Sequence, residues 1–199
     1  MQNGSRSGDD PCTRPQPQTL RRISTTRSWL SAGGVEAMKS FVAERPADTP
    51  ASFVILQHLA PDHESQLADI LSRSSKLPVQ EADETMSVAS GHIYVLTPDR
   101  YLTIVDHGLF VEPPTQPRGS RMPIDHFMRT LAETAGARSV GVILSGTGND
   151  GTAGLQTIKG VGGVALAQDP QTALYDGMPQ SPGRTPHGQR LTGRIRISE

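Results

Sequence analysis

The sequence has little of what stabilises a small secreted domain or a membrane protein. Its 199 residues include one cysteine, Cys12, so neither a disulfide within the chain nor a cysteine-based zinc site can form. No window approaches the ~20 apolar residues of a membrane span, and no apolar signal segment follows the start. The histidines show no metal-ligand spacing. We therefore expect a cytoplasmic protein with no membrane insertion, no metal and no cofactor.

Aromatic residues and net charge are also scarce, at 4% and -1. The first 28 residues hold five arginines and two aspartates, and the last 19 hold four arginines and one glutamate, so the chain between these ends is acidic. Nucleic-acid phosphates attract basic surfaces, and an acidic body is a poor partner for them. We expect no nucleic-acid partner.

Composition divides the chain into three parts. Residues 1–28 are rich in Pro, Gly, Ser, Thr, Arg and Gln, which predicts a disordered basic tail. Residues 29–180 are expected to form one α/β domain, long enough to be a catalytic domain. Residues 181–199 are expected to form a second, divergent basic tail. Within that last part, the alternation from Arg194 to Ile197 is compatible with a short strand.

Between the tails, strand and helix patterns alternate, which predicts a doubly wound α/β fold of three layers, with a mainly parallel sheet and an antiparallel hairpin region. The hairpin is expected at Asp106-His107-Gly108, between strands at 101–105 and 109–111. The other expected strands are 52–56, 93–96, 140–144 and 164–167. The expected helices are 35–42, one starting near Pro61-Asp62, 124–131 and 151–159.

Gly146, Gly148 and Gly151 spell the GxGxxG fingerprint of dinucleotide-binding domains. A strand precedes them, a helix follows, and Asp169 lies at about the ~20-residue spacing of the acid that binds a ribose. Asp150 argues against this interpretation, because a carboxylate inside the loop would repel a pyrophosphate. The loop also has no lysine of the kind found in P-loops.

In a second interpretation, the function of the glycine loop is to position Asp150. His58 and Asp150 follow predicted strands, and Ser31 follows the poorly patterned segment 23–30 and opens the first predicted helix, so the three are expected at one edge of the sheet. A serine nucleophile, a histidine base and an orienting aspartate form a catalytic triad. Each residue also has an ordinary structural explanation: Ser31 and Asp150 as helix N-caps, and His58 as a histidine at the edge of the core. The pattern alone leaves these alternatives open.

Longer motifs resemble a known family. Ser-Ala-Gly-Gly-Val-Glu-Ala-Met at 31–38, Ile-Leu-Gln-His-Leu-Ala-Pro-Asp-His at 55–63 and Leu-Ser-Gly-Thr-Gly-Asn-Asp-Gly at 144–151 are similar to segments of CheB-type protein-glutamate methylesterases. Further matches lie at 91–95, 97–100, 123–127, 167–170 and 176–179. The resemblance covers residues 31–181, and its 123–127 segment is most similar to versions fused to a CheR-type receptor methyltransferase.

The resemblance implies a doubly wound α/β domain in which Ser31 is the nucleophile, His58 the base and Asp150 the orienting acid. It implies hydrolysis of glutamate methyl esters on the signalling helices of chemoreceptors, in the adaptation of chemotaxis, and deamidation of glutamines there. Thr147 stands where many members carry Met, and its backbone N–H is an expected oxyanion donor. A receptor methyltransferase is a second candidate partner, and the glycines shape a catalytic loop.

The chain departs from the family pattern at both ends. Trp29 replaces a small residue before the serine, at what is expected to be a tight strand-to-helix turn, and 23–30 is too polar for a central parallel strand. We expect no phosphoacceptor receiver domain before the catalytic part, and the resemblance ends after Ser181. A gene fragment, a frameshift or a mistaken start would each give this pattern. A catalytically impaired remnant that only binds a receptor or partner is therefore the alternative to an active enzyme.

Overall fold

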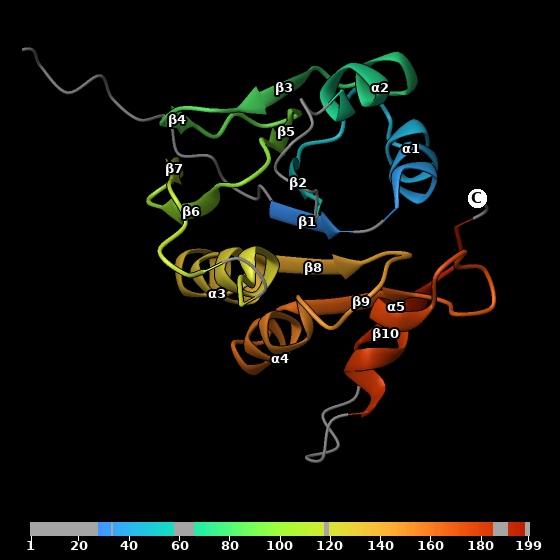
Figure 1. The fold of residues 1–199 in the computed structure, drawn as a ribbon. Helices are drawn as coiled ribbons and strands as arrows, with labels where there is room; N and C mark the ends of the chain where they lie inside the picture. Colours follow the sequence, from blue (N-terminus) through green and yellow to red (C-terminus); the bar gives the residue numbers. More distant parts are fainter. Residues whose placement is uncertain (1–27, 33, 58–65, 118–119, 185–190, 198–199) are drawn as a thin grey trace, which may run out of the picture.

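A seven-stranded sheet forms the centre of the fold (Figure 1). The structure is a computed structural model and describes residues 28–32, 34–57, 66–117, 120–184 and 191–197. The strands of this sheet are β1 (Ser28–Ala32), β2 (Ser52–Leu56), β3 (Val79–Ala82), β5 (Ile93–Leu96), β8 (Ser139–Ile143), β9 (Val164–Gln168) and β10 (Gly193–Ile195). Their order is β10-β9-β8-β1-β2-β5-β3, and every neighbouring pair is parallel.

Helices cover both faces of this sheet, which confirms the predicted doubly wound, three-layer α/β fold (Figure 1). Helices α1 (Val35–Ala43) and α2 (Leu67–Ser74) lie on one face, and α3 (Pro123–Ala135) and α4 (Thr152–Gly160) on the other. A short helix, α5 (Gly177–Gln180), and two 3-10 turns, Gly136–Arg138 and Ser181–Arg184, complete the described helical elements. In the described part of the chain, no helix is long and apolar enough to cross a membrane.

Strand β2 shows why the two faces carry separate apolar clusters. All five of its residues are buried, as expected for a parallel strand covered on both sides. Because side chains alternate along a strand, Val54 and Leu56 pack with α3 and α4, whereas Phe53 and Ile55 pack with α1 and α2. The uninterrupted apolar run of β2 thus contributes side chains to both apolar clusters, one on each face of the sheet.

The predicted hairpin forms a second, antiparallel sheet. Its strands are β4 (Met86–Ser87), β6 (Tyr101–Val105) and β7 (Gly108–Glu112), in the order β4-β7-β6. Asp106 and His107 form the two-residue turn, and both have positive φ, 46° and 67°. Turns of this kind match the twist of the strands that they join, so the sequence signal identified the hairpin correctly.

Strand β1 corrects one expectation from the sequence. It lies between β2 and β8 at the centre of the sheet, with Trp29 opposite Phe53 and Val140, although 23–30 was expected to be too polar for a central strand. The described strand runs from residue 28 to 32, and the polar segment at 23–27 lies outside the described residues. Trp29 therefore stands within the strand rather than at the turn before α1.

Other differences concern short or polar elements. Helix α2 begins at Leu67 rather than near Pro61-Asp62, two residues outside the described part. Strands β3 and β4 and helix α5 were not predicted. β3 is an edge strand whose central residues, Gln80 and Glu81, are exposed, so it lacks the apolar pattern of a buried strand.

The chain continues into the sheet after residue 180, where the α/β body was expected to end. The alternation from Arg194 to Ile197 corresponds to β10, which pairs with β9, and the Ile197 side chain is buried in the cluster under α1. Arg194 and Arg196 are exposed, whereas the two isoleucines that alternate with them pack against the core. This alternation explains how so polar a segment can belong to the folded body.

A glycine in α4 fixes how closely α3 approaches. A Cβ atom on Gly154 would lie 2.5 Å from Cβ of Met128, whereas a Cβ on Gly160, at the end of the same helix, would meet nothing within 4 Å. We predict that Gly154→Ala lowers the free energy of unfolding by ~1–3 kcal/mol through overpacking. Gly160→Ala should be neutral or stabilising by up to ~1 kcal/mol. Urea unfolding of both variants tests this, and equal effects would contradict it.

Candidate active site

Two of the three predicted site residues, Ser31 and Asp150, lie at the carboxyl edge of the parallel sheet. Ser31 is the penultimate residue of β1, opposite Ile55 of β2 and Val142 of β8. For Ser31 the structure describes the backbone, whereas His58, the second residue after β2, lies outside the described residues. Asp150 lies on the loop after β8. Ser31 therefore lies at the end of β1, and the segments that contain His58 and Asp150 follow the two strands adjacent to it, β2 and β8.

A cavity of about 430 Å³ opens at this edge. Its walls come from the segments after β1, β2 and β8, together with the start of α3 and the chain around α5. The lining residues are Gly34, Gln57, Ile124, Ser145, Gly146, Thr147, Tyr175 and Met178. Ligands of open α/β sheets bind in this place, outside the carboxyl ends of the strands. The volume is sufficient for one polar side chain and its reacting group.

Asp150 is buried beside this cavity, with 8% of its surface exposed. Its carboxylate accepts two hydrogen bonds from α3, from the backbone N–H of Ile124 at 3.1 Å and of Asp125 at 2.9 Å. The positive end of the helix dipole stabilises a negative charge there. Asp150 is therefore not the N-cap of α4, as its ordinary structural explanation supposed. That position is Gly151, with φ of 95° and no side-chain cap.

Asp125 makes the reciprocal contact, so that α3 and α4 exchange aspartates: Asp150, just before α4, binds the start of α3, and Asp125 of α3 binds the start of α4. Its Oδ1 accepts a hydrogen bond of 2.6 Å from the backbone N–H of Gly154, in the first turn of α4. Each helix thus has its N-terminus capped by an aspartate from outside its own first turn. Burial raises the pKa of Asp125, against the lowering effect of the backbone N–H groups of α4 and of the Arg129 charge. Asp125 lies in the 123–127 motif, but its role could not be read from the sequence.

The glycine loop is not arranged as a phosphate cradle. The N–H of Ser145 donates to Oε1 of Gln168 at 2.8 Å, and that of Gly146 donates to the carbonyl of Tyr175 at 2.9 Å. The first turn of α4 binds Asp125 instead of an anion from solution. These are the donors that a pyrophosphate would need. The backbone N–H groups of Thr147 and Gly148, in contrast, have no acceptor among the described residues.

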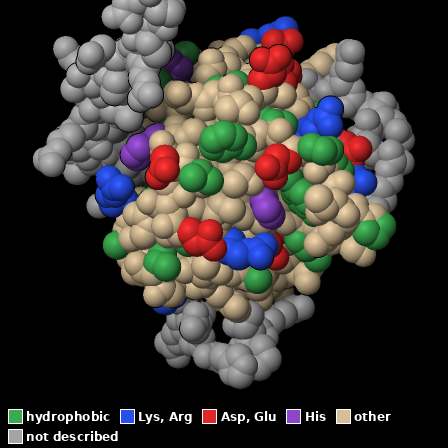
Figure 2. All heavy atoms as spheres, turned by 90° about the vertical axis from the view of Figure 1, so that its left-hand side faces the viewer, with side chains coloured by type: hydrophobic (Ala, Val, Ile, Leu, Met, Phe, Trp, Pro, Cys, Tyr) green, Lys and Arg blue, Asp and Glu red, His purple; other side chains and the backbone are tan. Residues whose placement is uncertain are grey.

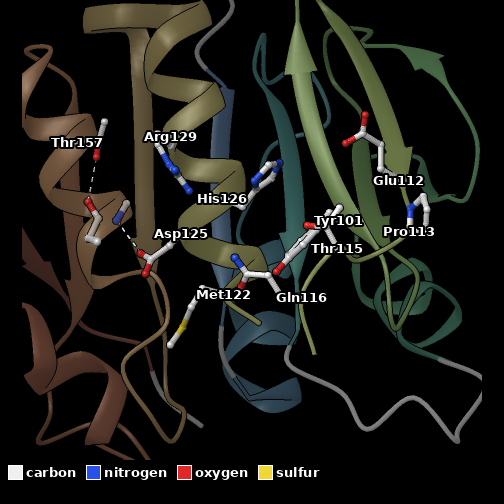
Figure 3. Close-up of a pocket in the computed structure, with 12 residues that line it drawn as sticks. Tyr101, Glu112, Pro113, Thr115, Gln116, Met122, Asp125, His126, Arg129 and Thr157 are labelled. Atoms are coloured by element: carbon white, nitrogen blue, oxygen red, sulfur yellow. Dashed lines mark hydrogen bonds between the residues drawn. The ribbon is translucent and has the colours of Figure 1, made fainter. Parts of the chain in front are cut away.

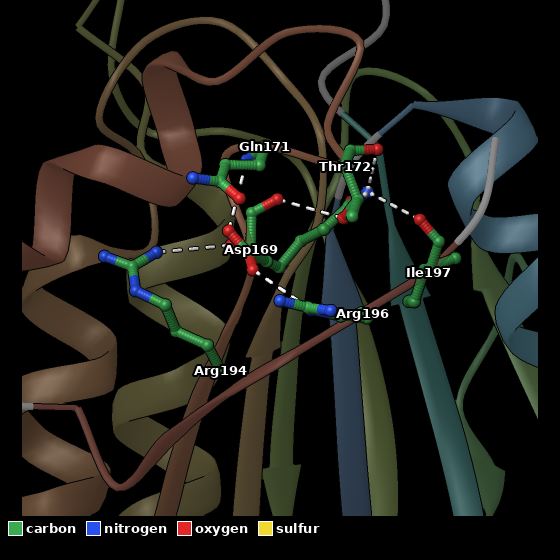
Figure 4. A network of polar contacts seen from close by, with 7 residues as sticks. Asp169, Gln171, Thr172, Arg194, Arg196 and Ile197 are labelled. Atoms are coloured by element: carbon green, nitrogen blue, oxygen red, sulfur yellow. Dashed lines mark hydrogen bonds and ion pairs between the residues drawn. The ribbon is translucent and has the colours of Figure 1, made fainter.

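Asp169, the candidate ribose ligand, also has other partners. Figure 4 shows its carboxylate between the turn that follows it and β10. Oδ1 accepts a hydrogen bond from the N–H of Gln171 at 3.1 Å, and Oδ2 lies 3.4 Å from Nε of Arg196. Its carboxylate therefore caps a turn and pairs with Arg196, the residue after β10. The groups that the dinucleotide interpretation needed for the phosphates and for the ribose thus have other partners.

Ser31 is not the N-cap of α1. The helix begins at Val35, and Gly34 holds the cap position with extended φ and ψ and no side-chain hydrogen bond. The N–H of Gly34 donates to the carbonyl of Ser145, which ties the turn after β1 to the loop after β8. A serine at the end of a central strand, followed by a glycine-containing turn and a helix, matches the strand–turn–helix setting of serine nucleophiles.

A second cavity, of about 600 Å³, lies on the other side of the start of α3 (Figure 3). Met122, Asp125, His126 and Arg129 line it from α3 and its approach, and Tyr101 from β6. The His126 ring stacks on Tyr101, with ring centroids 4.9 Å apart, and its Nε2 lies 2.9 Å from Oγ1 of Thr103. Burial, and then the charge of Arg129, lowers the pKa of His126.

Gln168 is a site residue that the sequence did not reveal. It is fully buried at the end of β9, and its Oε1 accepts the hydrogen bond from Ser145 described above. Its Nε2 donates to the carbonyls of Thr172, at 3.0 Å, and Ile197, at 3.4 Å. One amide thus joins the loop after β8 to the turn after β9 and the segment after β10. Among the described residues, no cluster of His, Cys, Asp or Glu could hold a metal ion.

Comparisons with known proteins agree with this arrangement. A family model described as CheB methylesterase matches residues 29–190. A protein-glutamate methylesterase/protein-glutamine glutaminase of Photorhabdus laumondii is 35% identical over 156 residues, which are 76% of this chain and 44% of that protein. A putative protein of the same description from Leptospira interrogans is 35% identical over 76% of this chain and 79% of its own length.

A solved structure supports the same relationship. The crystal structure of the Thermotoga maritima CheB methylesterase catalytic domain has a TM-score of 0.76 and 25% sequence identity, and the match covers 86% of this chain and 93% of that one. The chain spans less than half the length of the Photorhabdus relative.

The exchanged aspartates predict a pH-dependent effect on stability. Because the folded-state pKa of Asp125 is raised above 3.8, its ordinary value, the folded protein binds more protons there than the unfolded chain. The contribution of Asp125 to the free energy of unfolding therefore falls as the pH rises above that value. Asp125→Asn keeps an acceptor for Gly154 but does not titrate, so its stability relative to wild type should rise as the pH increases above 3.8. Urea unfolding at several pH values measures this, and a pH-independent difference would contradict it.

Proposed function

The chain belongs to the CheB methylesterase family, and we propose that it hydrolyses the methyl esters of glutamate side chains on chemoreceptors during chemotactic adaptation. The observation that carries the proposal is the cavity at the carboxyl edge of the sheet. Gly34, Gln57 and Ser145 in its wall belong to the three segments that also contain Ser31, His58 and Asp150. A nucleophile, a base and an orienting acid supplied by these segments would act on a side chain that enters the cavity.

In the proposed reaction, Oγ of Ser31 attacks the ester carbonyl while His58 takes the hydroxyl proton. The tetrahedral intermediate collapses, the C–O bond to the methoxy group breaks, and His58 returns the proton so that methanol leaves. Water, deprotonated by His58, then attacks the acyl-enzyme, which releases the glutamate and restores Ser31. With a glutamine side chain, the same steps would release ammonia, and this deamidation is part of the proposal.

Two features of the described residues support these roles. The N-terminus of α3 stabilises negative charge on Asp150, through the two N–H groups that bind its carboxylate. An ionised Asp150 would orient the imidazole of His58 and stabilise its protonated form. The N–H groups of Thr147 and Gly148, which have no acceptor among the described residues, are suited to the oxyanion.

The substrate we propose is a methylated signalling helix of a chemoreceptor, and a receptor methyltransferase is a proposed second partner. The alternative is a remnant that binds without turnover, and both Trp29 and the altered end of the chain favoured it. Trp29 lies within β1, two residues before Ser31, rather than at the turn before α1, so one of these two arguments is weakened. The alternative remains a defined outcome of the experiment below.

Methanol release from a methylated receptor signalling fragment tests the proposal. We predict release by the wild type and a loss of about 10³-fold or more in Ser31→Ala, because the acyl-enzyme cannot form. Asp150→Asn should lose about 10⁴-fold in kcat, since an amide would favour the wrong tautomer of His58.

Ser28→Ala is the matched control, because it removes another hydroxyl from the same strand, three residues earlier. It should release methanol at close to the wild-type rate. Far-UV circular dichroism checks that each variant is folded. No release by folded wild-type protein, or equal release by wild type and Ser31→Ala, would reject the proposed function. Binding of the fragment without release would favour the remnant.

A further inference from the structure

Two neighbouring apolar side chains stand out at the rim of the candidate active site. Leu174 is 70% exposed and Tyr175 is 56% exposed, the highest values for large apolar side chains in the described part of the chain. They lie on the loop between β9 and α5, at the carboxyl edge of the sheet (Figure 1). Single exposed apolar residues are common on protein surfaces, whereas these two are adjacent and one of them, Tyr175, lines the cavity.

The backbone under this pair is held in place. The N–H of Tyr175 donates to Oγ of Ser145 at 2.9 Å, and its carbonyl accepts the hydrogen bond from Gly146. The N–H of Met178 donates to the carbonyl of Gly146, also at 2.9 Å. The loop after β8 therefore fixes this loop from both sides of Tyr175. Apolar side chains on a fixed backbone lose little entropy on binding, which suits them as anchors for a partner.

Tyr175 also connects the exposed pair with the cavity, since its side of the loop forms part of the cavity wall together with Thr147 and Met178. A glutamate ester is a short side chain. When it enters the cavity, the backbone that carries it stays outside at the rim, to which the half-exposed Tyr175 belongs. If that backbone is helical, the residue three or four positions away lies about 5 Å along the helix, on the same face.

From this geometry we propose that Leu174 and Tyr175 form a docking surface for the helical segment of the protein substrate. An apolar side chain on the ester-bearing face of that helix packs on Leu174 while the ester lies in the cavity. This is recognition of an amphipathic helix by an apolar surface, and it selects esters on a helix over free esters. The inference rests on the proposed function, because it concerns how the same cavity receives its substrate.

The test compares a helical and a small substrate in the same variants. The helical substrate is a methylated receptor signalling fragment, and the small one is the γ-methyl ester of N-acetylglutamate. Leu174→Asp places a charge in the docking surface, and Leu174→Met keeps it apolar. Val161→Asp is the matched control, since Val161 is 40% exposed at the far end of α4. Methanol release gives kcat and KM, and fluorescence anisotropy gives the Kd of the labelled fragment.

We expect Leu174→Asp to raise KM and Kd for the fragment by about tenfold, the scale of one interface anchor. Its loss of kcat/KM on the fragment should exceed any loss on the small ester by a similar factor. Leu174→Met and Val161→Asp should behave as wild type. An unchanged Kd in Leu174→Asp would overturn the inference, as would equal losses on both substrates, which would indicate damage to the catalytic loop.

Two further outcomes separate this inference from the proposed function. If no substrate is hydrolysed but Leu174→Asp still weakens fragment binding, the docking surface stands and the esterase proposal fails. If sedimentation shows a dimer that only Leu174→Asp dissociates, while fragment binding is unchanged, a second copy of the chain covers this surface and the inference is rejected.

Discussion

The exchange of aspartates between α3 and α4 is the interaction on which the candidate site depends. Asp150, before α4, binds the first turn of α3, and Asp125, within α3, binds the first turn of α4. The buried carboxylate of Asp150 and the partly buried one of Asp125 each accept backbone N–H groups, and each helix end receives an acceptor that it would otherwise lack. Gly154 permits the close approach that this exchange needs. The position of Asp150 at the cavity is thus set by helix packing as well as by its loop.

The same exchange explains why a GxGxxG sequence does not make a nucleotide site here. Glycines in such a motif are needed where the backbone turns sharply or where elements approach closely. Gly148 and Gly151 meet the first need, with φ of 97° and 95°. A phosphate site further requires that the N–H groups remain free. In this loop Ser145 and Gly146 donate to Gln168 and Tyr175. The difference lies in long-range partners, which the motif does not contain.

Local patterns predicted the elements whose causes are local. The buried run of β2, the Asp106-His107 turn and the apolar stripe of α3 each have a periodicity or a turn chemistry that can be read from the sequence. Strand β1 contains two serines and is defined by pairing with β2 and β8, so composition alone misjudged it. Ser31 and Asp150 could be nominated as site residues from their places in the strand–helix pattern. Asp125, Gln168 and Tyr175 could not, since the partners that tie them to the site lie 23 to 30 residues away along the chain.

Gln168 links the loop that lines the cavity to the edge of the sheet. Its single side chain satisfies the N–H of Ser145 and the carbonyls of Thr172 and Ile197, in a position with no exposed surface. An apolar residue there would leave the N–H of Ser145 and the carbonyl of Ile197 buried without these hydrogen bonds, at ~1–3 kcal/mol each. The loop that lines the cavity is therefore held by the same amide that holds the segment after β10. A polar stretch such as residues 193–197 contributes to the site because it completes this network, although none of its residues lines the cavity.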